Sequence, residues 1–321
     1  MIEIYYKTDA GRIKSNNEDS IVVLRLNRGN SSENIDVSIF LVADGAGGHA
    51  TGEIASYLAN RTLATYLVSN ILYPPNADKE DIVKLLSDGI TYANKSVINY
   101  VKKNPASEGM GTTIVAAVVC GKKMVIGHVG DSRAYRIYND SIVQLTKDHS
   151  LIQDLIDNGK ITKEEARIHP KKNVIFRAIG ANNDIEADIQ TIYLYQDDII
   201  LLCSDGLTDM LTDSEIKNIV VNGNDTLQEK CNKLVDSANK AGGNDNISVV
   251  LFKVNNIPSR KDILGKDTYI DTSPSSQFMP KKDDILNKDT IIMESESHAI
   301  GINIRLGKYL DKFTKRLSRS S

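Results

Sequence analysis

Three aspartates share one local setting that suits the binding of divalent cations. Asp44 and Asp205 each come at the end of an apolar run and each precede a glycine, while Asp245 follows two glycines and precedes another apolar run. We expect each carboxylate at the end of a buried strand, where the backbone holds it rigidly and glycine permits close approach. These three side chains are therefore the first candidates for a reactive site.

Carboxylates that converge on one point repel one another and need a cation or protons. The sequence places no histidine and cysteine cluster beside them, and hard oxygen ligands suit Mg²⁺ or Mn²⁺. Two such ions about 3.5–4 Å apart can deprotonate a bridging water and clamp a phosphoryl group. An isolated Asp-Gly pair is usually a turn, and Asp88-Gly89 lies in a helical pattern. The hypothesis of phosphate ester hydrolysis therefore depends on the three aspartates taken together and on the residues around them.

The elements that position these aspartates follow from the hydrophobic pattern. Strands are predicted at residues 2–6, 21–26, 37–43, 112–120, 124–129, 134–138, 199–203 and 246–254. Helices are predicted at residues 51–72, 79–101 and 226–240, with capping boxes beginning at Thr162 and Thr212. Strands joined by short turns indicate antiparallel pairing, and their irregular order relative to the helices predicts an α+β fold.

Seven segments in order along the chain resemble the motifs of bacterial type 2C, metal-dependent serine/threonine protein phosphatases. They are residues 8–11 with 17–19, 44–49 with 52–53, 109–113, 128–133, 145–150, 204–207 and 243–248. The resemblance covers about residues 5–254. It implies a four-layer αββα sandwich, in which helices flank two antiparallel β-sheets, followed by a flexible C-terminal tail.

The resemblance also implies a role for each matching residue. Asp44 bridges two tightly bound Mn²⁺ or Mg²⁺ ions, and Asp205 with Asp245 holds the first ion. The second ion is held by the carbonyl of Gly45, with Glu18 or Asp19 acting through bound water; Asp131 with Asp205 binds a weaker third ion. The implied activity is hydrolysis of phosphoserine and phosphothreonine in proteins by a water bridging two ions, opposing a serine/threonine kinase.

Two positions depart from the family pattern. Lys14 stands where an arginine usually grips the substrate phosphate, and lysine offers charge without a bidentate fork. Arg12, two residues earlier in the sequence, is the alternative candidate for binding the substrate phosphate. Ala46 replaces the methionine of bacterial members, or the histidine proposed elsewhere as a general acid. His49 is then a candidate proton donor, and its alternative role is that of a structural loop residue.

Composition limits the remaining classes of function. The chain has 321 residues, 41% of them hydrophobic, and a net charge of −3, which gives no indication of nucleic-acid binding. Three scattered cysteines indicate a reducing compartment. The start of the sequence lacks the pattern of a signal peptide, and no apolar run is long enough to span a membrane. We expect a cytoplasmic protein.

Residues 1–255 are predicted to form the catalytic domain, in which residues 148–180 resemble the family's flap beside the active site. Residues 256–298 are expected to be a disordered linker, in which a short sequence repeats at an offset of 22 residues. Thr268 and Thr290 in that repeat are candidate docking or phosphorylation sites, and a duplicated spacer is the alternative. Residues 299–321 have the pattern of a basic amphipathic helix, which suits an anionic membrane surface, a partner's groove or the catalytic domain itself.

Two other functions compete with protein dephosphorylation. One is a binding protein that only sequesters phosphoproteins. Such a protein has no need for Asp44, Asp205 and Asp245 together, so their presence argues against it. A hydrolase of small phosphate esters needs the same site chemistry, so the sequence leaves that alternative open.

Overall fold

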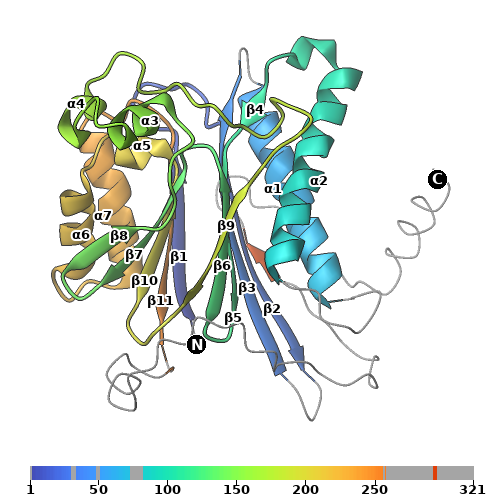
Figure 1. Cartoon of the computed structure of the whole chain (residues 1–321). Coiled ribbons are helices and arrows are strands. Elements are labelled where there is room, and N and C mark those ends of the chain that lie inside the picture. The colour runs from blue at the N-terminus through green and yellow to red at the C-terminus, as the bar shows by residue number, and fades with distance from the viewer. Residues whose placement is uncertain are drawn as a thin grey trace.

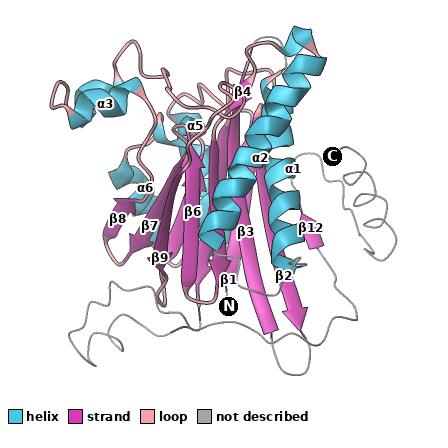
Figure 2. Ribbon diagram, turned by 45° about the vertical axis from the view of Figure 1, so that its right-hand side comes forward, coloured by secondary structure: helices cyan, strands magenta, loops and turns pink. Residues whose placement is uncertain are grey.

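The computed structural model of the chain describes residues 2–29, 34–47, 51–72, 82–255, 257 and 292–294. Two β-sheets pack face to face, and a pair of helices covers the outer face of each (Figures 1 and 2). All paired neighbours in both sheets are antiparallel. The predicted αββα sandwich is confirmed.

The two sheets are formed by strands from distant parts of the chain. The first has the order β1 (Ile2–Asp9), β11 (Ile247–Val254), β10 (Ile199–Cys203), β7 (Arg133–Tyr138) and β8 (Ser141–Gln144). The second has the order β12 (Ile292–Glu294), β2 (Asp19–Gly29), β3 (Asn34–Ala46), β5 (Ile114–Cys120), β6 (Lys123–Val129) and β9 (Asp188–Tyr193), and β4 (Gly111–Thr112) pairs with the end of β3. The strands nearest the two ends of residues 1–255, β1 and β11, are therefore neighbours.

Three apolar layers separate the four layers of secondary structure. Helices α1 (Gly52–Leu72) and α2 (Ile82–Lys103) pack on the second sheet, and α6 (Asp213–Val221) and α7 (Leu227–Lys240) on the first. Along β10, Leu202 faces the other sheet and Leu201 faces the helices. Because successive strand residues point to opposite faces, strands covered on both sides are apolar throughout. Phe40 and Phe252 stack between the sheets with ring centroids 4.3 Å apart.

Short helices lie near the end of the sandwich where β4 is found (Figure 1). They are η1 (Pro105–Ser107), α3 (Leu151–Asp157), α4 (Lys163–Arg167) and α5 (Asp205–Thr208). The capping boxes predicted at Thr162 and Thr212 are both present, and Thr226 forms a third at the start of α7. In each, the threonine hydroxyl accepts a backbone N–H that the first helical turn leaves unpaired.

The boundaries of several strands differ from the prediction. The glycines after Asp44 do not end β3, which continues through Gly45 and Ala46 because these residues pair with β4. Strands β8 and β9 were not predicted, since both contain only half-buried and exposed residues and so lack a continuous apolar run. Strand β11 begins at Ile247 rather than Asn246.

Most of the C-terminal segment lies outside the described residues, including Thr268, Thr290 and residues 299–321. Strand β12, within the predicted linker, pairs with residues 23–25 of β2. Among the helices that the structure describes, none combines the length and apolar character needed to cross a membrane.

Candidate active site

Asp44 of β3 and Asp19 of β2 lie directly opposite each other in the strand pairing. Residues opposite in an antiparallel pair project their side chains from the same face of the sheet. The backbone of Asp44 is fixed by Thr113, whose hydroxyl accepts the Asp44 N–H at 3.0 Å and whose own N–H donates to the Asp44 carbonyl at 2.9 Å. The pairing therefore places two carboxylates side by side on rigid backbone.

Asp205 comes from the other sheet and joins this pair. It is the first residue of α5, directly after Ser204, whose hydroxyl donates to Oδ2 of Asp19 at 2.7 Å. The carboxyl groups of Asp205 and Asp44 are close enough for each to shift the pKa of the other. A Cβ at Gly206 would lie 2.0 Å from the carbonyl oxygen of Asn246, so no larger residue fits there. The sheet ends thus meet through polar groups at one end of the sandwich.

Lys14 and Asp245 form an ion pair, with the lysine Nζ 2.6 Å from Oδ1 of Asp245. Burial opposes the charge of Lys14, but its hydrogen bond to Asp245 and the nearby carboxylates of Glu18 and Asp44 raise its pKa above the usual value. Lys14 is thus held charged among the acidic residues, where it can also meet an anionic substrate.

The loop that carries Lys14 and Glu18 is held by the side chain of Asn246. Its Oδ1 accepts the N–H of Glu18 at 2.7 Å, and its Nδ2 donates to the carbonyls of Ala10 at 3.0 Å and Asn16 at 2.8 Å. Sequence reasoning gave Asn246 no role. Asn246 lies within the 243–248 motif and directly follows Asp245, and this position was the one feature of the sequence that could have indicated its role.

Gly45 and Gly52 bring the start of α1 against the loop with Glu18. A Cβ at Gly45 would lie 2.1 Å from the Gly52 carbonyl oxygen, and one at Gly52 would lie 2.8 Å from Oε2 of Glu18. The Gly52 N–H donates to the Glu18 carboxylate, as expected for an acidic group at a helix N-terminus. Glycine at both positions permits this approach.

Burial is the main reason why the aspartates hold protons at unusually high pH. It raises the pKa of Asp19 to about 7 and that of Asp205 to about 6. The pKa values of Asp44 and Asp131 are raised well above their usual range by burial, and then by the charges of neighbouring acids, Asp205 first. Asp131, in the turn between β6 and β7, thereby belongs to the same cluster.

The cluster fits a divalent cation. Oδ1 of Asp19 and Oδ1 of Asp205 are buried, and neither has a hydrogen-bond partner among the residues that the structure describes. Buried acceptors without donors are costly, and acidic oxygens without imidazole or thiolate favour Mg²⁺ or Mn²⁺. All the predicted site residues that the structure describes lie in this cluster: Lys14, Glu18, Asp19, Asp44, Gly45, Asp131, Asp205 and Asp245. His49 lies outside the described residues.

The predicted flap is tied to the Asp205 side of the site. Arg167 of α4 donates to the carbonyl oxygens of Thr208, Asp209 and Leu211, at and just beyond the end of α5. Lys172 forms an ion pair with the Asp209 carboxylate. The flap therefore has polar anchors at the end of the helix that Asp205 begins and on the residues that follow it.

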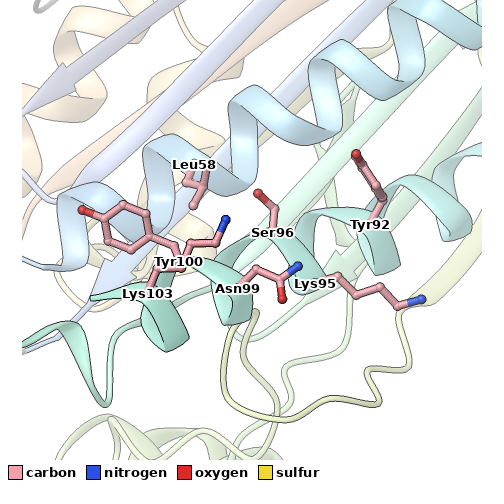
Figure 3. Close-up of a pocket in the computed structure, with 7 residues that line it drawn as sticks. All are labelled: Leu58, Tyr92, Lys95, Ser96, Asn99, Tyr100 and Lys103. Carbon is pink, nitrogen blue, oxygen red and sulfur yellow. The ribbon is translucent and has the colours of Figure 1, made fainter. Parts of the chain in front are cut away.

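A groove between α1 and α2, with a cavity volume of about 290 Å³, is separate from this cluster (Figure 3). Its lining residues are Leu58, Tyr92, Lys95, Ser96, Asn99, Tyr100 and Lys103. No acidic side chain is among them, so the groove cannot provide the carboxylate chemistry described above.

Known proteins share both the sequence and the fold. Residues 14–251 match the family model of protein phosphatase 2C. The chain is 39% identical over 258 residues to the serine/threonine phosphatase stp of Listeria innocua, covering 80% of this chain and 98% of the relative. The chain therefore belongs to the protein phosphatase 2C family. It is an enzyme, a protein phosphatase of the serine/threonine class.

Solved structures show the same architecture. The S. agalactiae serine/threonine phosphatase aligns with a TM-score of 0.69 and 34% identity, over 79% of this chain and 100% of that one. The catalytic domain of the phosphatase PstP, solved in complex with two manganese ions, aligns with a TM-score of 0.66 and 30% identity, over 79% of this chain and 99% of that one.

Proposed function

We propose that the chain hydrolyses phosphoserine and phosphothreonine in proteins at a site that holds two Mn²⁺ or Mg²⁺ ions through Asp44, Asp205 and Asp245. The observation that carries this proposal is the buried acidic cluster, whose raised pKa values and unpartnered oxygens suit the binding of cations. The two manganese ions in the related PstP catalytic domain support it. When bound, such a pair of ions supplies an activated water for in-line attack on phosphorus.

Each acidic residue has a specific part in this proposal. Asp44, central in the cluster, would hold both ions, and Asp205 and Asp245 would complete the first site. The Gly45 carbonyl would contribute to the second site, with Glu18 or Asp19 acting through bound water. Asp131, whose pKa responds to the charge of Asp205, forms with it a third and weaker site.

Two basic residues act on the substrate in this proposal. Lys14 binds the substrate phosphate as a point charge, because its ammonium already lies among the carboxylates that hold the cations. His49 donates the proton to the leaving hydroxyl group, a role proposed from the sequence alone.

Dephosphorylation of proteins opposes a serine/threonine kinase, which we propose as the functional counterpart of this enzyme.

Residues 299–321 are proposed to bind an anionic membrane surface. Co-sedimentation with anionic liposomes should then be lost when these residues are deleted.

Phosphate release from a phosphothreonine peptide tests the proposed function. We expect release in Mn²⁺ or Mg²⁺, loss of release in EDTA, and recovery when excess metal is returned. A hydrolase of small phosphate esters would instead cleave such an ester but not the peptide. A binding protein without activity would bind the peptide and release no phosphate.

A further inference from the structure

His149, at the start of the flap, contacts the turn that carries Asp131. Its side chain is 7% exposed, and its Nδ1 accepts the N–H of Gly130 at 3.1 Å. The backbone N–H of His149 donates to the Gly130 carbonyl at 2.9 Å. Gly130 has a φ of +104° and directly precedes Asp131. The position of Asp131 is thus set from one side by His149.

The other side of the imidazole faces Asp188 at the start of β9, a residue that Arg177 of the flap also contacts. Because Nδ1 accepts a hydrogen bond, Nε2 carries the proton, and it lies 3.3 Å from Oδ2 of Asp188 on β9. The second oxygen of Asp188 accepts from Arg177 at 2.9 Å. Phe176 donates its N–H to the His149 carbonyl at 2.7 Å. Burial and then the neighbouring His128 lower the pKa of His149, which keeps the ring neutral.

A second metal site is the alternative explanation of this group, since His128, His149 and Asp188 place potential ligand atoms within 4.8 Å of one another. Three contacts argue against it. Nε2 of His128 already lies 2.8 Å from the Lys147 carbonyl. A cation on Nε2 of His149 would require a proton on Nδ1, directed at the N–H of Gly130. Arg177 also occupies the Asp188 carboxylate.

We infer that His149 is a positioning residue that couples the flap to the Gly130–Asp131 turn, so that cation binding at Asp131 and order in the flap depend on each other. This inference rests on the proposed function only in taking Asp131 as a cation ligand. Residues that orient the ligands of a metal usually change its affinity by about 10–100-fold when altered.

Two nearly isosteric variants separate the two connections. In His149→Asn, the side-chain oxygen can replace Nδ1 and keep the Gly130 contact while the Asp188 contact is lost. In His149→Gln, the amide can replace Nε2 and keep the Asp188 contact while the Gly130 contact is lost. Asp188→Ala removes the carboxylate that links the His149 imidazole to Arg177, without changing His149. His169→Asn is the control, because His169 lies in the flap and contacts the N–H of Lys171 instead.

Hydrogen exchange of residues 150–176, measured with and without Mn²⁺, together with calorimetric titration of Mn²⁺, tests the coupling. We expect Mn²⁺ to slow flap exchange in the wild type and in His169→Asn, but not in the two His149 variants or Asp188→Ala. We also expect the weakest Mn²⁺ affinity to fall by about 10-fold in these three variants.

If His149 has only a structural role, the two His149 variants and Asp188→Ala will have lower thermal stability, but their flaps will still respond to Mn²⁺. That result would overturn the inference. A wild-type flap that does not respond to Mn²⁺ would overturn it too. Failure of the proposed function would appear separately, as a wild type that releases no phosphate from the phosphothreonine peptide.

Discussion

Lys14 holds its ammonium nitrogen 2.6 Å from Oδ1 of Asp245, a residue proposed to bind a cation. Both side chains are more than a third exposed, at 44% and 35%, so the pair itself adds little to stability. A cation on Asp245 would compete with Lys14 for the carboxylate. We therefore expect Lys14 to turn to the substrate phosphate when the site is loaded.

Replacement of Lys14 should change KM more than kcat. Lys14→Ala removes one charged hydrogen bond to phosphate, which is expected to raise KM for a phosphothreonine peptide by about tenfold. Lys14→Arg supplies a bidentate fork and should lower KM below that of the wild type. Steady-state kinetics at saturating Mn²⁺ provide the measurement. An unchanged KM in both variants would exclude Lys14 from phosphate binding.

The metal-free protein should lose stability as the pH rises. Asp19 and Asp205 have folded pKa values of about 7 and about 6, against 3.8 for an unperturbed aspartate. The folded chain therefore binds more protons than the unfolded chain between about pH 4 and 7, and stability falls across that range. The carboxylates of Glu215 and Glu229 have lowered pKa values, so their contribution to stability changes at lower pH and does not offset this trend.

Thermal unfolding in EDTA should show a lower Tm at pH 8 than at pH 5.5. Added Mn²⁺ should raise Tm more at pH 8, because binding requires deprotonated carboxylates. A Tm in EDTA that is higher at pH 8 would show that the cluster does not control stability.

Asp19→Asn should stabilise the metal-free protein while it weakens cation binding. The substitution keeps the shape of the side chain and removes one charge from a buried group of like charges. Its oxygen can still accept the hydrogen bond from Ser204. At pH 8 we expect a higher Tm in EDTA than the wild type has, and a smaller increase on addition of Mn²⁺. A lower Tm in EDTA would mean that the Asp19 charge is already compensated within the protein.

Local sequence patterns predicted the α+β class and the three aspartates Asp44, Asp205 and Asp245, whereas the sandwich and the other residues of the cluster were predicted from the family resemblance. Strands covered on both faces are apolar throughout, as β10 is, and the aspartates stand at the ends of such runs. The extension of β3 past Asp44 could not be predicted locally, since it depends on pairing between Gly45 and Thr112, which are 67 residues apart (112 − 45).

The supporting contacts were also beyond local reasoning. Asn246 contacts residues more than 200 positions away, and the hydrogen bond of Ser204 to Asp19 joins the two sheets. His149 lies in a recognised motif, but its link to Asp188 depends on where β9 returns. Such positioning residues become visible only when the tertiary structure brings distant segments together.

The most direct test of the two-metal assignment compares Asp205→Asn with Asp88→Asn in phosphothreonine peptide hydrolysis at saturating Mn²⁺. Both substitutions neutralise an aspartate that precedes glycine, but Asp88 lies on α2 and pairs with Lys84. We expect Asp205→Asn to lose activity by about 10²-fold or more with its fold intact, and Asp88→Asn to retain activity. Comparable activity in Asp205→Asn and the wild type would contradict the proposed site.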